Sequence, residues 1–312
     1  MSNTLARLSC CGLLLAALVM PQNRIEAQPD KRGGALVTAQ WLATRVDDPS
    51  VRIIDLGKTL EQFETGHIPG AVFVEWRADL ADPARAPFFD AAPKSSVEAL
   101  LSRLGVEPND TIVLYDSQSS RLAARMFWLL RYYGHRDLRI LDGGADGWEA
   151  AGFAQSVSLP TIEATDYRFD AMRSELRADL GTVTDALRRT NVVLVDARAP
   201  EFFTGEATGS QFQSDRPNAK VGRIPGARNM FWADHFNADG TFRSITELAA
   251  RYAAAGIGPE QTVISYCHVG LQASTPWFVL SELLGYPDVR LYDSSMAEWA
   301  NTDGTPLETG SD

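Results

Sequence analysis

Two stretches of the sequence decide the fold: Thr111-Ile112-Val113-Leu114-Tyr115-Asp116 in the first half and Thr262-Val263-Ile264-Ser265-Tyr266-Cys267 in the second. Each is a short apolar run rich in β-branched residues, which is typical of a buried strand. A helix-like segment follows each run after a few residues. We therefore expect two equivalent strands that end at Asp116 and Cys267.

The two halves of the chain repeat each other at a constant spacing. Three pairs of residues show this spacing: the strand ends at 116 and 267, the glycines at 134 and 285, and the tryptophans at 148 and 299. The differences 267 − 116, 285 − 134 and 299 − 148 all equal 151. A Gly-x-Ile-Pro-Gly-Ala loop also occurs in both halves, at Gly66–Ala71 and at Gly222–Ala227. One offset held over three landmarks indicates a tandem duplication.

Within each half, short apolar runs alternate with helical patterns. We predict strands near residues 51–55, 72–74, 111–115, 138–141, 192–196, 262–266 and 289–292. We predict helices near residues 38–46, 96–104, 121–133, 182–189, 246–255 and 272–284. This alternation predicts an α/β fold whose mostly parallel sheets have helices on both faces, with ligands bound beyond the carboxyl ends of the strands.

Composition excludes several classes of function. The chain has 312 residues, 45% of them hydrophobic and 22% charged, which is typical of a globular protein with room for two domains. The formal net charge of −11 argues against nucleic acid and anionic membrane as partners, because both need a basic surface.

The N-terminus has the features of a secretory signal. Arg7 precedes an apolar run from Leu8 to Met20, and Ile25-Glu26-Ala27 precedes a cleavage site before Gln28. The run is short for a membrane span, although an uncleaved anchor is the alternative. We expect a signal peptide at residues 1–27, a periplasmic or secreted mature protein, and no membrane association once the signal is removed.

Cleavage there would remove Cys10 and Cys11 and leave Cys267 as the single cysteine. A single thiol cannot form an internal disulfide, and in an oxidising compartment it risks oxidation. Between a strand end and a helix N-terminus, it meets backbone N–H groups that favour the reactive thiolate. Cys267 is therefore the candidate nucleophile, with inert packing as the alternative.

With these motifs, the chain resembles the tandem-domain rhodaneses, a family of sulfurtransferases, over residues 35 to 305. The resemblance depends on the Gly66–Ala71 loop, on Leu141-Asp142-Gly143-Gly144 at a strand exit, and on a strand-end cysteine with Gly270 three residues later. It implies two rhodanese-like domains at residues 28–153 and 178–312, joined by a linker at 154–177. It also implies that the first domain, with Asp116 in place of cysteine, is catalytically silent.

The family mechanism implied by the resemblance is double displacement. The Cys267 thiolate takes sulfane sulfur from a small anionic donor and passes it from a persulfide to cyanide or a thiol. The loop residues His268, Val269, Gly270, Leu271 and Gln272 are expected to turn their N–H groups toward the sulfur, with glycine allowing a left-handed turn. No cofactor and no metal are expected.

Arg198 and Arg216 are the expected substrate arginines by the same resemblance, with surface ion pairs as the alternative. The His268–Gln272 loop matches neither the thiosulfate-preferring nor the mercaptopyruvate-preferring pattern. Thiosulfate is the narrowly preferred donor, and 3-mercaptopyruvate is the alternative. His67, in the first Gly-x-Ile-Pro-Gly-Ala loop, has no assigned role beyond orienting that loop.

Two further classes of protein share parts of this pattern. Phosphatases on this scaffold need an arginine six residues after the cysteine, and Ala273 stands there instead. A persulfide carrier or interaction module with little turnover of its own would need the same thiolate as an enzyme. The sequence leaves that alternative open.

Overall fold

The duplicated strands lie at the centres of two five-stranded parallel sheets. The computed structural model describes residues 34–57, 59–86, 88–117, 119–210 and 216–310. The first sheet has the order β1-β5-β4-β2-β3, with bounds Leu36–Val37, Leu138–Leu141, Thr111–Tyr115, Val51–Asp55 and Val72–Phe73. The second has the order β6-β10-β9-β7-β8, with bounds Arg177–Ala178, Val289–Tyr292, Thr262–Tyr266, Val192–Asp196 and Arg228–Asn229. The expected α/β class with parallel sheets is confirmed; the expected signal peptide lies outside the described residues.

Helices cover both faces of the first sheet. Its helices are α1 (Ala39–Ala43), α2 (Leu60–Thr65), α3 (Trp76–Asp79), α4 (Lys94–Arg103), α5 (Arg121–Tyr133) and α6 (Gly144–Ala150), with a 3-10 turn at Pro83–Arg85. Alternate residues of β4 face opposite sides, as the period of a strand requires. Ile112 and Leu114 pack with α4 and α5, whereas Val113 and Tyr115 pack with α1, α2 and α6.

The second sheet is covered in the same way. Its helices are α7 (Leu180–Ala186), α8 (Pro200–Thr204), α9 (Ile245–Ala254), α10 (Ser274–Phe278) and α11 (Ser295–Trp299), with short turns at Ser174–Leu176 and Trp232–His235. A π-helical turn, Val279–Leu283, continues α10. Side chains from α9 and α10 share a core with Val263, while those from α7, α8 and α11 pack with Ile264 and Tyr266 on the other face.

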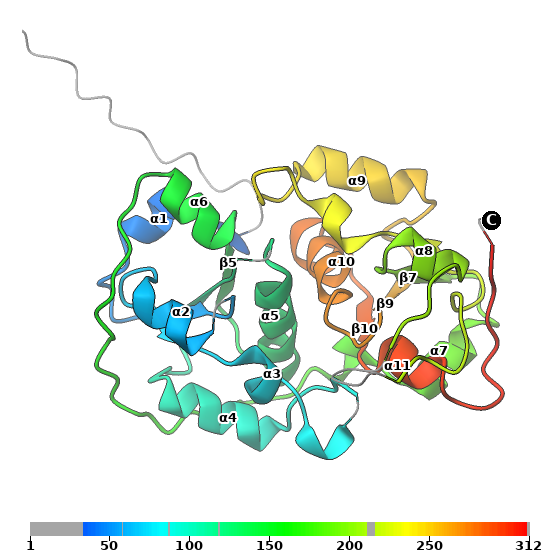
Figure 1. The fold of residues 1–312 in the computed structure, drawn as a ribbon, viewed down its shortest axis with the longest axis horizontal. Helices are drawn as coiled ribbons and strands as arrows, with labels where there is room; N and C mark the ends of the chain where they lie inside the picture. Colours follow the sequence, from blue (N-terminus) through cyan, green and yellow to red (C-terminus); the bar gives the residue numbers. More distant parts are fainter. Residues whose placement is uncertain (1–33, 58, 87, 118, 211–215, 311–312) are drawn as a thin grey trace, which may run out of the picture.

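The segment between the domains follows the surface of the first domain (Figure 1). Residues 154–173 contain no helix or extended strand. The N–H groups of Thr165 and Phe169 donate to Ser102 and Glu98, which both belong to α4. Lys94, also on α4, donates to the Phe169 carbonyl oxygen over 3.1 Å. Hydrogen bonds therefore attach this part of the segment to α4.

The two domains share an apolar core. Helix α5 of the first domain packs against α10 of the second, where the rings of Phe127 and Phe278 meet edge to face with centroids 4.9 Å apart. The apolar cluster around these helices also includes residues of α4 and α9. Because this core is continuous across the interface, we expect the domains to be held together by burial of apolar surface.

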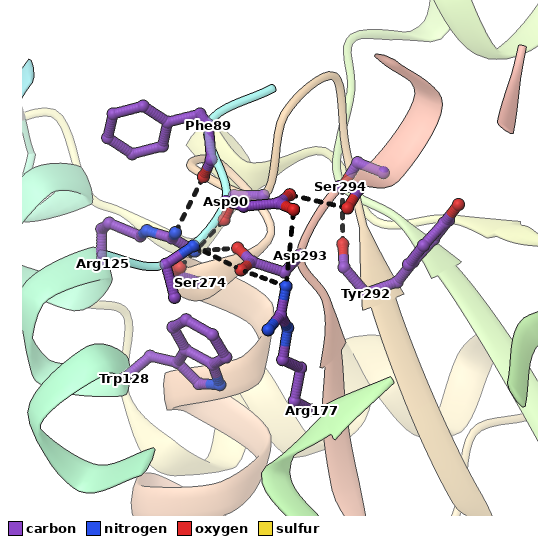
Figure 2. A network of polar contacts seen from close by, with 12 residues as sticks. Phe89, Asp90, Arg125, Trp128, Arg177, Ser274, Tyr292, Asp293 and Ser294 are labelled. Atoms are coloured by element: carbon purple, nitrogen blue, oxygen red, sulfur yellow. Dashed lines mark hydrogen bonds and ion pairs between the residues drawn. The ribbon is translucent and has the colours of Figure 1, made fainter. Parts of the chain in front are cut away.

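A buried polar network lies at the same interface (Figure 2). Arg125 of α5 donates to Asp293, which follows β10, over 2.7 Å, and neither side chain is exposed. The second carboxylate oxygen of Asp293 accepts from the Ala91 N–H over 2.7 Å. Ser294 donates to Asp90 over 2.6 Å. These bonds tie the end of β10 to the first domain.

Candidate active site

Cys267 comes directly after the central strand β9, where the parallel sheet presents its carboxyl ends. Its side chain is fully buried and makes no disulfide. Its N–H donates to the hydroxyl of Ser295 over 3.0 Å, and its carbonyl oxygen accepts from the Met296 N–H over 3.1 Å. Both partners belong to the first turn of α11, so this helix fixes the backbone of the reacting residue.

The loop after Cys267 depends on Gly270. This glycine has φ +79°, and a Cβ at its position would lie 2.9 Å from a carboxylate oxygen of Asp293. The Ser274 hydroxyl donates to the Gly270 carbonyl over 3.0 Å, which closes the loop onto α10. The sequence-based expectation of a left-handed glycine is confirmed, and the close approach of Asp293 adds a second reason for glycine.

Burial and the loop act on the thiol in opposite directions. Burial raises the pKa of Cys267, while the N–H groups of Ala273, Val269 and Gln272 lower it and nearby Asp196 raises it further. The sequence predicts N–H groups around the sulfur and a favoured thiolate. The N–H groups are present, but the loss of water outweighs them, so the neutral thiol is favoured in this arrangement.

Arg198 lies close to the sulfur but is already bound to Asp196. Its Nε donates to the Asp196 carboxylate over 2.9 Å, its Nη2 donates over 2.6 Å, and Nη2 also donates to the Gly222 carbonyl over 2.8 Å. Its guanidinium is buried and interacts favourably with the Cys267 thiolate. The ion pair is thus internal and not on the surface, and a direct role in donor binding stays a prediction.

His268 follows the nucleophile directly, and its side chain is partly buried. Burial lowers its pKa to about 4, so the ring is neutral near pH 7. The ring meets Phe202 edge to face with centroids 4.6 Å apart, and a Cβ on Gly209 would lie 2.7 Å from its Nδ1. His268 therefore brings no positive charge to the site at neutral pH.

The remaining predicted contacts differ in exposure. The side chains of Val269 and Leu271 are buried, and Gln272 is partly buried with an Oε1 that has no hydrogen-bond partner among the described residues. Arg216 is exposed and follows the segment 211–215, which the structure does not describe. Their roles as donor ligands stay predictions.

His67 holds the linker. Its Nδ1 lies 2.7 Å from the Phe63 carbonyl oxygen, and its Nε2 lies 3.3 Å from the carbonyl oxygen of Ser158. The ring is buried and stacks on Phe63 with centroids 4.0 Å apart. These contacts give His67 a structural role in its loop.

The equivalent loop of the first domain holds an anion of its own. One carboxylate oxygen of Asp116 accepts from the N–H groups of Leu122 and Ala123 over 2.7 and 2.8 Å, and the other accepts from Ser120 over 3.0 Å. Asp116 is buried at the position that corresponds to Cys267. This loop geometry therefore stabilises a buried negative charge with main-chain donors.

Sequence reasoning missed three residues of the site. Ser295 fixes the Cys267 backbone, and Trp232 and Arg121 meet across the domain interface, where the guanidinium lies 5.2 Å from the indole centroid. The offset of 151 could have pointed to Arg121, because 272 − 121 = 151 pairs it with Gln272. No short sequence pattern marks the other two.

A cavity of about 520 Å³ opens beside the interdomain network of Figure 2. Its lining includes Arg85, Asp90, Arg177, Ser294 and Glu298. Cys267 is not among its lining residues, so we do not assign the donor site to this cavity.

The described residues, 34–310 with the gaps given above, contain neither a metal-ligand cluster nor a membrane-spanning helix. In these residues, no three His, Cys, Asp or Glu side chains are grouped so that they could hold a metal ion. Over the same ranges, no helix is both long and apolar enough to cross a bilayer.

Comparison with known families agrees with the duplicated architecture. The sequence matches the family described as "Rhodanese-like domain" twice, at residues 38–151 and 179–302. It is 37% identical over 287 residues to a Mycolicibacterium smegmatis protein named "Putative thiosulfate sulfurtransferase", which covers 90% of this chain and 99% of that protein. It is 34% identical to "Sulfur carrier protein TtuD" of Thermus thermophilus, over 88% of this chain and 96% of that protein.

Two solved structures have the same arrangement of both domains. Escherichia coli SseA, described as a 3-mercaptopyruvate sulfotransferase, superposes with a TM-score of 0.74 at 26% identity, over 84% of this chain and 98% of that chain. A variant of the protein EanB, described as carrying a cysteine persulfide with ergothioneine, superposes with a TM-score of 0.79 at 26% identity, over 89% of this chain and 71% of that chain.

Proposed function

The chain belongs to the rhodanese family and is a sulfurtransferase, and we propose that it carries sulfane sulfur from thiosulfate to cyanide or a thiol on Cys267. The observation that carries this proposal is the loop after β9, where three main-chain N–H groups act on one buried sulfur. Asp116 supports it, because the equivalent loop already holds a carboxylate in the same way.

The reaction has two displacement steps. The Cys267 thiol first loses its proton, and the thiolate attacks the outer sulfur of thiosulfate. A new S–S bond forms on the enzyme, the S–S bond of thiosulfate breaks, and sulfite leaves with the electron pair. Cyanide then attacks the outer sulfur of the persulfide, thiocyanate leaves, and the thiolate returns.

The main-chain N–H groups lower the free energy of both anionic forms, the thiolate and the persulfide. Burial opposes them, so deprotonation of Cys267 is part of the cost of the first step. The buried apolar contacts of Val269 and Leu271 keep water from the persulfide, which protects it from side reactions between the two steps.

The direct test is mass spectrometry of the purified protein after incubation with thiosulfate or with 3-mercaptopyruvate. We expect one added sulfur atom on the peptide that contains Cys267, and its removal by cyanide. Cys267→Ser should gain no sulfur and show no transfer, while its circular dichroism spectrum and unfolding midpoint stay near those of the wild type. Sulfur transfer by this variant would refute the role of Cys267.

Two relatives favour specific alternatives. The 3-mercaptopyruvate sulfotransferase fold of SseA favours that donor, and the carrier name of the Thermus relative favours a persulfide carrier. Steady-state kinetics with both donors distinguish the thiosulfate sulfurtransferase, the 3-mercaptopyruvate sulfurtransferase and the persulfide carrier. Fast cyanolysis with thiosulfate supports the first proposal, fast transfer from 3-mercaptopyruvate supports the second, and a stable persulfide with slow turnover supports a carrier.

We further propose that the protein acts in the periplasm or outside the cell, because residues 1–27 have the features of a cleaved signal. N-terminal sequencing of the protein from its own host tests this. A mature chain that begins near Gln28 is expected, and one that retains Met1 to Ala27 counts against export.

A further inference from the structure

Both candidate donors are anions, so the active site needs a positively charged residue to bind them. The catalytic loop contains no arginine or lysine, and its histidine is neutral near pH 7. The nearby guanidinium of Arg198 is bound to the carboxylate of Asp196 through two nitrogens. The catalytic loop and Arg198 therefore offer little positive charge to an anionic donor.

The first domain places an arginine at the shared interface. Arg121 is the first residue of α5 and comes one residue after Ser120, whose N–H donates to the Asp116 carboxylate. Helix α5 packs against α10, the helix that follows the catalytic loop (Figure 1). The two loops of the duplication therefore approach each other through these helices.

The side chain of Arg121 reaches the second domain. Its guanidinium lies 5.2 Å from the ring centroid of Trp232, within the range of a cation–π contact. The Trp232 N–H donates to the carbonyl oxygen of Ala197 over 3.1 Å, and Ala197 lies between Asp196 and Arg198 at the end of β7. Because β7 pairs with β9, this contact brings Arg121 to the strand ends where Cys267 lies.

The charges that act on Arg121 also place it near the active site. Burial lowers the pKa of Arg121, while the Asp116 carboxylate and the Cys267 thiolate both act to raise it. The guanidinium therefore interacts with the reacting sulfur although the two residues belong to different domains. An arginine in such a site keeps its charge.

We propose that Arg121 binds the anionic group of the sulfur donor at Cys267, so that the first domain supplies the charge that selects anionic donors. This inference rests on the proposed function and deepens it. The duplication explains the arrangement: Gln272 is the counterpart of Arg121, so the basic residue lies in the silent loop and an amide in the catalytic one. The guanidinium can bind a sulfonate or a carboxylate oxygen in a bidentate way.

The matched variants are Arg121→Gln, Arg121→Lys and Arg45→Gln. Arg45 is a suitable control because it is also partly buried and lies over a tryptophan, Trp41, at 4.3 Å, but belongs to the segment after α1 in the first domain. For Arg121→Gln we expect the KM for the anionic donor to rise roughly 10-fold to 100-fold, the loss expected for a charge-assisted hydrogen bond. Cyanolysis of the preloaded persulfide should fall less than transfer from the donor, because cyanide is an anion but has no oxygen atoms for the guanidinium to bind in a bidentate way. Arg121→Lys should recover part of the loss, and Arg45→Gln should match the wild type.

A second measurement is independent of turnover. The rates at which iodoacetate, an anion, and iodoacetamide, which is neutral, alkylate Cys267 are compared in each protein. We expect the iodoacetate to iodoacetamide ratio to fall about tenfold in Arg121→Gln and to stay unchanged in Arg45→Gln. An unchanged ratio together with an unchanged KM overturns the proposal. A wild type that is inactive with both donors counts against the proposed function, and the alkylation ratio then decides the role of Arg121.

Discussion

At the scale of single residues, the site is a balance between burial and main-chain hydrogen bonds. The same type of loop holds a carboxylate at Asp116 and a thiol at Cys267, and both side chains are buried. The Asp116 carboxylate accepts three main-chain N–H groups within 3.0 Å, which stabilise its negative charge. Three N–H groups also lower the pKa of the Cys267 thiol, but burial raises this pKa by more. Without bound donor, this balance favours the neutral thiol of Cys267 near pH 7.

This balance predicts the pH dependence of Cys267 alkylation. Since burial raises the pKa of Cys267 above its ordinary value of 9.0, the rate with iodoacetamide should rise about tenfold per pH unit from pH 7 to 9 without a plateau. The stability gained from burying the neutral thiol is fully present below pH 9.0 and is lost as pH rises through the raised pKa. Cys267→Ser is the control for labelling elsewhere. A plateau below pH 8 would contradict the raised pKa.

Asp116→Ala should affect stability more than transfer. Removing the carboxylate leaves the N–H groups of Ser120, Leu122 and Ala123 without their acceptor, which costs about 1–3 kcal/mol of unfolding free energy. The rate of sulfur transfer should fall less than tenfold, because no thiol is lost. Urea unfolding and steady-state kinetics measure the two effects. Near-total loss of transfer in a folded variant would show that the first domain takes part in the chemistry.

At the scale of secondary structure, β9, the catalytic loop, α10 and α11 form one unit. Ser295 in α11 accepts the N–H of Cys267, and Ser274 in α10 donates to Gly270. Asp293 lies against Gly270 on the other side. The loop is thus held at its start, Cys267, and from two sides at its middle, Gly270, which keeps its N–H groups directed at the sulfur.

Gly270→Ala tests how closely the loop is held. The added Cβ would contact Asp293, and the alanine backbone would have to adopt φ +79°. We therefore expect the rate of sulfur transfer to fall at least tenfold and the unfolding free energy to fall by about 1–3 kcal/mol. Gly256→Ala is the matched control, because Gly256 has φ +72° but no atom within 4 Å of its Cβ position. The control measures the strain of φ alone. Equal effects of the two substitutions would show that contact with Asp293 is unimportant.

At the scale of the whole molecule, the two duplicated domains form one folded body in which each has a different role. The apolar core runs through both domains, and the Arg125–Asp293 pair is buried within it (Figure 2). Arg125 also donates to the Phe89 carbonyl over 3.0 Å and lies over Trp128. Because Asp293 also touches the catalytic loop, the contact between domains and the geometry of the nucleophile are physically linked.

Arg125→Gln should destabilise the protein strongly. Loss of the guanidinium removes a charge-assisted hydrogen bond from the buried Asp293 carboxylate, which keeps Arg177 at 3.3 Å and the Ala91 N–H as partners, so we expect a cost of about 1.5–3 kcal/mol. Urea unfolding measures the change. The control is Arg188→Gln, which removes an exposed pair with Asp185 and should change the unfolding free energy by less than about 1 kcal/mol. A loss of under 1 kcal/mol for Arg125→Gln would show that the pair contributes nothing to the joined domains.

Much of this architecture could be predicted from local sequence. The strands at residues 51–55, 111–115, 138–141, 192–196, 262–266 and 289–292 have the predicted bounds, because buried strands need continuous apolar runs. Helix α5 also has its predicted bounds, 121–133. The sequence analysis does not predict the two-residue strands β1, β6 and β8 or the short helices α2, α3, α6, α8 and α11, since these elements depend on their neighbours and not on their own pattern.

The sequence alone determined the duplication, the parallel sheets, the position of Cys267 at a strand end and the need for glycine three residues later, because periodicity and backbone conformation are local properties. Only the tertiary structure decided the charge state around the sulfur. It buried the thiol, bound Arg198 to Asp196, neutralised His268 and brought Arg121 from the first domain to Trp232 of the second. Desolvation and charge pairing depend on which distant residues share a site, and one-dimensional spacing does not specify that.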